Sequence, residues 1–111
     1  MIQIYACKRN FDVQKAERYF KERRIQVQFV DMGKKGPGKK EVQLFLQKLG
    51  NPGIFDTKSK KYMEHILRFT SDPDRIVEMI MDEPDLIKTP IVRNGQQVTQ
   101  GFCPDVWKDW N

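Results

Sequence analysis

Two cysteines, Cys7 and Cys103, are the side chains in this sequence best suited to nucleophilic or redox chemistry. A cysteine reacts as its thiolate, so its surroundings control its reactivity by moving the thiol pKa away from about 8.5. The two residues are far apart and lack both the CxxC spacing of a redox motif and the ligand spacing of a metal site. The simplest interpretation is therefore two buried, reduced thiols.

Each cysteine also has a position from which it could do chemistry. Cys103 directly precedes Pro104-Asp105, near the start of an expected final helix. The unpaired N–H groups at a helix N-terminus can lower a thiol pKa. Cys7 lies at the mouth of a loop after the first expected strand, so its activation should be weaker. If both thiols face that loop, they could form a redox pair across it.

The elements around Cys7 predict a βαβ unit. Ile2–Ala6 is apolar at most positions, as expected of a central strand covered on both faces. A helix is expected from about Asp12 to Arg24, with apolar residues at three- and four-residue spacing, and Asn10 is a good residue to cap it. A second strand is expected at Ile25–Val30, and connections of this kind are right-handed and parallel in nearly all cases.

The rest of the chain predicts a helical insertion followed by a hairpin. Residues 32–38 are rich in glycine and are expected to form a surface loop. Helices are expected at 39–49, 59–69 and from 71 to about 82, so the insertion spans about 39–82. The Asn94-Gly95 turn between two short β-branched runs is a strong hairpin signal, and a short helix follows it. The 111 residues thus predict one α/β domain with a four-stranded mixed sheet.

Composition narrows the classes of function. The net charge is +5, but the lysines are spread out rather than interleaved with aromatic residues, so nucleic-acid binding is not expected. No apolar run approaches the roughly 18 residues of a membrane span, and the N-terminus lacks a signal-peptide pattern. We therefore expect a cytoplasmic protein and a monomer. His65, the only histidine, has no partner at metal-ligand spacing, so no metal site is predicted.

Four segments carry a resemblance to known proteins. They are Ile4-Tyr5 at a strand end, the helical Lys15-Ala16-Glu17-Arg18-Tyr19-Phe20, the Lys-Gly-rich loop before Lys40-Glu41, and Leu86-Ile87-Lys88-Thr89-Pro90-Ile91-Val92 followed by Gly101. In this order and spacing, the chain resembles the arsenate reductase (ArsC), Spx and YffB-like family over nearly all of its length. The resemblance implies a thioredoxin/glutaredoxin-like fold.

The resemblance also implies that the catalytic residue of the family is missing. Asn10 stands at the loop position where these proteins keep their nucleophilic cysteine. An amide has no ionisable proton, so it cannot form a mixed disulfide or attack arsenate. The family's arsenate reductases have a basic residue before the proline, where this chain has Thr89, and further basic residues in the insertion and in the last loop. Phe102 stands in the last loop here, and Asp56 or Lys58 is the nearest match in the insertion. Arsenate reduction is therefore not expected.

The family's fold further implies a cleft at one end of the sheet. The Thr89-Pro90 bond is usually cis in this fold and should lie beside Asn10. Exposed backbone donors at the helix terminus would make the cleft a weak anion site. The residues expected to form the cleft, with Cys7 and Cys103 as the candidate nucleophiles, are Lys8, Arg9, Asn10, Phe11, Asp12, Lys58, Thr89, Pro90, Gly101 and Phe102.

Two hypotheses of function follow. In the first, the chain is a binding or regulatory protein whose ligand is a partner protein or a small anion or thiol, glutathione included, with no resident cofactor. An Spx-like regulator that contacts RNA polymerase is a variant of this hypothesis. In the second, the chain is a glutaredoxin-like thiol-disulfide oxidoreductase that uses Cys7 or Cys103. The reactivity of the two thiols separates the hypotheses.

Overall fold

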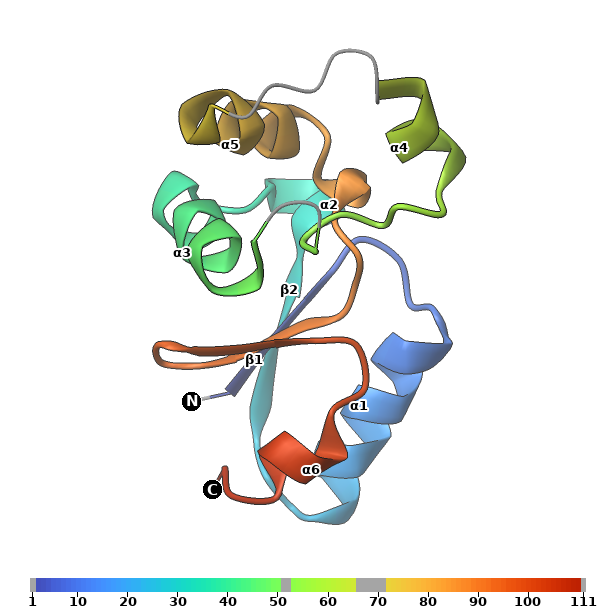
Figure 1. Cartoon of the computed structure of the whole chain (residues 1–111). Coiled ribbons are helices and arrows are strands. Elements are labelled where there is room, and N and C mark those ends of the chain that lie inside the picture. Colours follow the sequence, from blue (N-terminus) through green and yellow to red (C-terminus); the bar gives the residue numbers. More distant parts are fainter. Residues whose placement is uncertain (1, 51–52, 66–71, 111) are drawn as a thin grey trace.

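The computed structural model describes residues 2–50, 53–65 and 72–110 and contains a mixed four-stranded sheet in the order β2-β1-β3-β4 (Figure 1). The strands are β1 (Ile2–Ala6), β2 (Val27–Asp31), β3 (Ile91–Asn94) and β4 (Gln97–Gln100). β1 pairs in parallel with β2 and antiparallel with β3, and β3 forms the hairpin with β4. This confirms the predicted sheet. β2 begins two residues later than predicted because the backbone N–H of Ile25 still bonds the carbonyl of Phe20 at 2.9 Å, closing the preceding helix.

Helices cover both faces of the sheet (Figure 1). They are α1 (Phe11–Glu22), α2 (Met32–Lys35), α3 (Lys39–Leu49), α4 (Lys60–His65), α5 (Pro73–Asp82), the 3-10 helix η2 (Pro84–Leu86) and α6 (Pro104–Trp107). Within the described part of 39–82 no strand occurs, as predicted, and Phe55 makes only an isolated bridge to Ile87. The predicted stretch 66–69 of the third helix, and the predicted cap Ser71, lie outside the described residues.

Strand alternation divides the interior into two cores. Ile2 and Ile4 of β1 pack with α1 and with Trp107 of α6 on one face. Tyr5 points to the opposite face and packs with side chains of α3 and α5. Because successive side chains of a strand point to opposite sides of the sheet, a single central strand supplies both cores.

The segment 32–38 corrects the sequence analysis, because it begins with the short helix α2 instead of forming only a loop. Asp31 caps this helix by accepting a hydrogen bond from the backbone N–H of Gly33 at 2.9 Å. The side chain of Met32 is buried in the core with Tyr5. The glycine pattern signalled a break but did not reveal that a cap and an apolar contact precede it.

None of the described helices is long and apolar enough to cross a lipid bilayer.

Candidate functional site

Asn10 joins the start of α1 to the segment before β3. Its side-chain oxygen accepts a hydrogen bond from the backbone N–H of Val13 at 2.8 Å, which caps the helix. Its side-chain nitrogen lies 3.2 Å from the Thr89 hydroxyl oxygen and 3.3 Å from the Thr89 carbonyl oxygen. The Thr89-Pro90 bond is cis. The predicted cap and the predicted proximity of Asn10 to Thr89 are therefore both confirmed.

A cleft of about 390 Å³ opens beside Asn10. It is formed by the end of β1, the start of α1, the insertion up to and including the start of α4, and the segment that leads into β3. Its lining residues are Cys7, Lys8, Asn10, Asp12, Asp56, Ser59, Lys61, Asp85, Ile87, Lys88 and Thr89. The cleft thus gathers segments from three distant parts of the chain at one end of the sheet.

The cleft carries charges of both signs, with three lysines and three aspartates in its lining. The ammonium group of Lys61 lies 2.9 Å from the Asp85 carboxylate and 3.8 Å from that of Glu83. The hydrogen bond to Asp85 raises the pKa of Lys61, which is therefore charged throughout the neutral range. Because this lysine is already paired and aspartates stand around it, the cleft is not a simple oxyanion site.

Some of the predicted cleft residues lie in the lining and others do not. Cys7, Lys8, Asn10, Asp12 and Thr89 line the cleft. Pro90 is buried directly behind Thr89 and accepts, through its carbonyl, a hydrogen bond from the N–H of Gly101 at 2.8 Å. The turn at 101–103 therefore supports the cleft from behind instead of lining it.

The remaining predicted residues point elsewhere. Arg9 lies over the ring of Phe29 and is 3.1 Å from Glu17, so it faces the outer side of α1. Phe102 packs edge-on against Trp107 on the α6 side of the sheet. Lys58 and Phe11 are exposed and are not among the lining residues. The structure therefore corrects the predicted convergence of all these side chains on one surface.

Five further lining residues were not predicted from the sequence, namely Ser59, Lys61, Asp85, Ile87 and Lys88. Residues 85–88 directly precede the Thr89-Pro90 step, so their proximity along the chain could have marked them as cleft residues. Lys61 and Asp85 are separated by 24 residues, and no local pattern connects them. Only the packing of α4 beside η2 brings their charges together.

The two cysteines lie against different cores, so they do not form the pair considered above. Cys7 packs with the core around Tyr5, and Cys103 with the core around Trp107. Both are free thiols. The sheet itself separates them, and this corrects the hypothesis of a pair across the loop.

Neither cysteine is activated by its surroundings. Burial, with the nearby carboxylates of Asp85 and Asp31, raises the pKa of the Cys7 thiol to about 11. Burial also raises the pKa of Cys103, although its hydrogen bond to the Gln100 carbonyl at 3.3 Å works in the opposite direction. Cys103 occupies the N-cap position of α6 but makes no side-chain capping hydrogen bond, and α6 has only four residues. Activation at the start of α6, which the sequence left open as an alternative, is therefore not supported, and Cys103 is half-buried.

We expect Cys7 to resist alkylation by iodoacetamide at pH 7. With a pKa of about 11, only about one Cys7 thiol in ten thousand is ionised at that pH. Its alkylation rate should rise nearly tenfold per pH unit up to about pH 10, as measured by mass spectrometry. The urea-unfolded chain is the control and should react at the rate of an ordinary thiol. A rate for folded Cys7 that levels off near pH 8 would contradict the burial seen here.

Within residues 2–50, 53–65 and 72–110, no three side chains of His, Cys, Asp or Glu are grouped as metal-ion ligands.

Comparison with known proteins gives the family. A model of the ArsC family matches residues 5–110. The uncharacterized protein YusI from Bacillus subtilis is 26% identical over 100 residues, which cover 86% of this chain and 85% of YusI. The structure of a YFFB protein superposes with a TM-score of 0.85 and 18% identity, covering 97% of this chain and 96% of that one. An arsenate reductase from Vibrio cholerae superposes with a TM-score of 0.80 and 21% identity, covering 95% and 92%.

At these identities the solved structures establish the fold, which is the thioredoxin-like fold predicted from the sequence. The family match extends over nearly the whole chain and includes both Asn10 and the Thr89-Pro90 step. This chain belongs to the ArsC family.

Proposed function

We propose that this chain is a binding or regulatory member of the ArsC family that does not reduce arsenate. One observation carries the proposal: Asn10 occupies the N-terminus of α1, where we place the family's nucleophilic cysteine. Its amide oxygen accepts a hydrogen bond from the backbone N–H of Val13, and its amide nitrogen donates to the hydroxyl and carbonyl oxygens of Thr89. The side chain thus serves as a structural cross-link, and it offers no group that could form a bond to arsenic or sulfur.

The alternative function, thiol-disulfide exchange by a relocated cysteine, has less support. Thiol exchange requires an accessible thiolate, and burial raises the pKa of both Cys7 and Cys103. The two thiols also belong to different cores, so one could not resolve a mixed disulfide formed by the other. We further propose a cytoplasmic location, which suits two free thiols.

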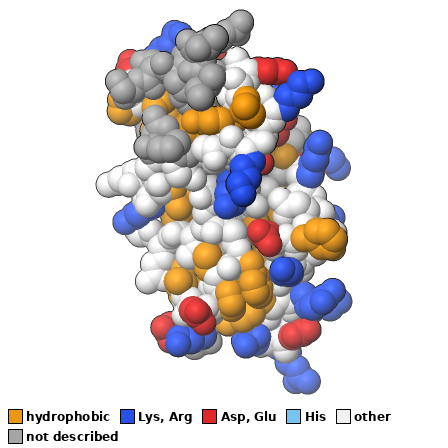
Figure 2. All heavy atoms as spheres, turned by 45° about the vertical axis from the view of Figure 1, so that its right-hand side comes forward, with side chains coloured by type: hydrophobic (Ala, Val, Ile, Leu, Met, Phe, Trp, Pro, Cys, Tyr) orange, Lys and Arg blue, Asp and Glu red, His pale blue; other side chains and the backbone are white. Residues whose placement is uncertain are grey.

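The charges of the cleft favour a ligand that carries both signs. Lys8 and Lys88 can face carboxylates, while Asp12 and Asp56 can face an ammonium group. Glutathione has two carboxylates and one ammonium group and fits this pattern, whereas the aspartates repel arsenate. Lysine and arginine side chains alternate with acidic and hydrophobic ones on the right-hand side of the fold of Figure 1, which Figure 2 turns forward. Binding of a small zwitterionic thiol by charge pairing is therefore the form of the function that we propose.

The proposal is tested first by activity and then by binding. With glutathione and glutaredoxin, or with thioredoxin, as reductant, arsenate turnover should equal that of a blank without protein. In an NMR titration, reduced glutathione should shift the amides of residues 8–13, with a dissociation constant of roughly 1 mM, equivalent to about 4 kcal/mol. Sulfate should shift the same amides less at equal concentration.

Three outcomes would contradict the proposal. Turnover of arsenate above the blank would mean that another group replaces the missing thiol. Glutathione shifts confined to residues 34–40, which include Lys34 and Lys39, would indicate nonspecific attraction to the basic loop. Equal shifts by sulfate and glutathione would show that the aspartates of the cleft do not select the ligand.

A further inference from the structure

The outer edge of β4 is open for pairing, except that the carbonyl of Gln100 accepts a hydrogen bond from the Cys103 thiol. β4 is the last strand in the sheet order, and no described strand lies beyond it. Asn94 and Gln97 flank the two-residue turn of the hairpin, and Thr99 stands opposite Val92. The Gly101 N–H to Pro90 carbonyl bond of 2.8 Å continues the same series of hydrogen-bonded pairs. Because hydrogen-bonded and non-hydrogen-bonded pairs alternate, the backbone N–H groups of Val98 and Gln100 point away from β3.

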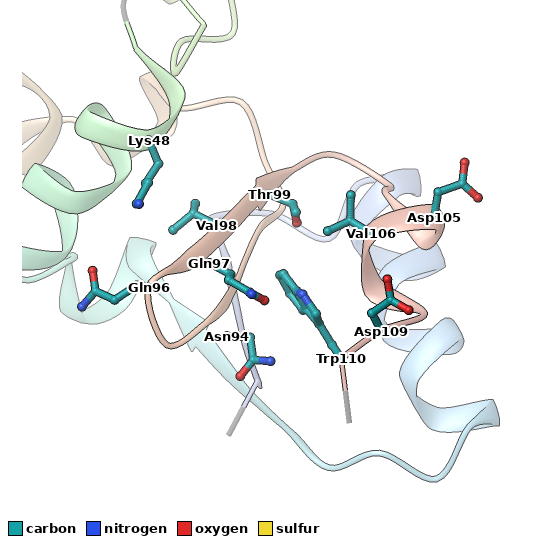
Figure 3. A pocket seen from close by; sticks show the side chains of 10 residues that line it. All are labelled: Lys48, Asn94, Gln96, Gln97, Val98, Thr99, Asp105, Val106, Asp109 and Trp110. Atoms are coloured by element: carbon teal, nitrogen blue, oxygen red, sulfur yellow. The ribbon is translucent and has the colours of Figure 1, made fainter.

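A hollow of about 870 Å³ runs along this strand, and it is larger than the cleft beside Asn10. Figure 3 shows the side chain of Lys48, from α3, on one side of β4, and those of Val106 and Asp109 on the other. Trp110 lies below the strand and is almost completely buried, so it forms a fixed part of the wall. β4 therefore runs along the middle of the hollow. One wall lies on the α3 face of the sheet, and the other lies on the α6 face.

The two walls differ in charge. Asp105 and Asp109 are both exposed on the α6 side, and between them Val106 keeps 47% of its surface exposed. Lys48 is the lining cation, and it stands on the α3 side. In a chain of net charge +5, the α6 wall is thus a local acidic surface with an apolar centre. This wall would attract a basic group.

We propose that β4 binds an extended segment of a partner protein, which adds to the sheet as a fifth strand and carries lysine or arginine toward Asp105 and Asp109. Directly opposed residues in neighbouring strands share a face, so the residue opposite Val98 lies on the α3 side with it. The residues before and after it lie on the α6 side, next to the acidic wall. In a segment that alternates apolar and basic residues, the apolar side chains can pack on the α3 side while the basic ones face the acidic α6 wall. The outward N–H groups of β4 can donate hydrogen bonds to the carbonyls of its backbone.

A second copy of this chain fits the same edge less well. Two β4 strands that pair antiparallel are related by a two-fold axis perpendicular to the sheet, so like faces stand side by side. Asp105 and Asp109 would then approach the same residues of the other copy, and the two Lys48 side chains would lie on the other common face. Like charges on both faces oppose this pairing, whereas a basic segment removes the repulsion.

The probe is an acetylated and amidated pentapeptide, Lys-Val-Lys-Val-Lys, titrated into the full ¹⁵N-labelled chain. We expect shifts centred on the amides of Val98, Gln100 and residues 105–109, and slower hydrogen exchange at Val98. The charge-reversed peptide Glu-Val-Glu-Val-Glu should bind at least about fivefold more weakly, because each exposed charge pair contributes only modestly.

Two variants separate strand addition from general attraction. Asp105→Asn with Asp109→Asn changes only exposed side chains and should weaken the lysine peptide about fivefold. Val98→Pro removes an outward N–H from an edge strand, where proline is tolerated, and should abolish the peptide-induced shifts at Gln100 and residues 105–109. Absence of shifts at Val98 and Gln100 up to the solubility limit of the peptide would overturn the proposal. So would equal binding of both peptides, or self-association of the chain that protects the Val98 amide.

Discussion

Replacing Trp107 with alanine should lower the free energy of unfolding by about 3–5 kcal/mol. The side chain is fully buried, and its ring lies 5.0 Å from that of Phe20 and 5.4 Å from that of Tyr19. Its indole N–H donates a hydrogen bond to the Thr99 hydroxyl at 2.8 Å, and that hydroxyl donates in turn to the carbonyl of Val92. The substitution therefore leaves a cavity and removes a donor from a buried acceptor.

Urea unfolding at constant pH measures this loss of stability. Two further variants show how much of it comes from the indole N–H and how much a substitution at a neighbouring position costs. Trp107→Phe keeps most of the ring contacts but loses the indole N–H, so a smaller loss of about 1–3 kcal/mol is expected. Val106→Ala, at a half-exposed neighbouring position, should change the stability by no more than about 0.5 kcal/mol. If Trp107→Ala cost no more than Val106→Ala, α6 would not pack on the sheet as described.

The Asn10→Cys variant should contain one thiol that is far more reactive than the two native ones. The introduced sulfur would lie at the N-terminus of α1, a helix of 12 residues whose first N–H groups and dipole stabilise a thiolate. A pKa of about 7 or lower is expected, so at least about half of the introduced thiol is ionised at pH 7. Burial holds the pKa of Cys7 at about 11. After allowance for the lower nucleophilicity of a weakly basic thiolate, the introduced thiol should alkylate roughly 50-fold faster than Cys7.

Peptide-resolved mass spectrometry across pH 5–10 measures this rate and the pKa together. Asn10→Ser is the matched control, because serine also caps a helix but offers no thiol. The control should keep the stability of the wild type to within a few tenths of a kcal/mol beyond the lost contact with Thr89. An introduced thiol with an ordinary pKa near 8.5 would mean that position 10 does not lie in the field of α1.

Local signals explain why much of the fold was predictable. Apolar alternation and helical spacing define β1, α1 and the hairpin, and each depends on residues that are close in sequence. Asn10 was recognised as the cap of α1 for the same reason, since a cap bonds a backbone N–H three residues later. The short helix α2 was missed because the glycines around it indicate a break, and because the core partners of Met32 belong to distant segments.

The sequence alone determined the family, the parallel pair and the hairpin of the sheet, and the presence of an amide at the start of α1, because these depend on patterns along the chain. Tertiary structure alone decided the character of the candidate site. Lys61 meets Asp85 across 24 residues, and the sheet separates Cys7 from Cys103. Charge balance and thiol pKa depend on burial and on charges a few ångströms away in space, and neither quantity is encoded by neighbours in sequence.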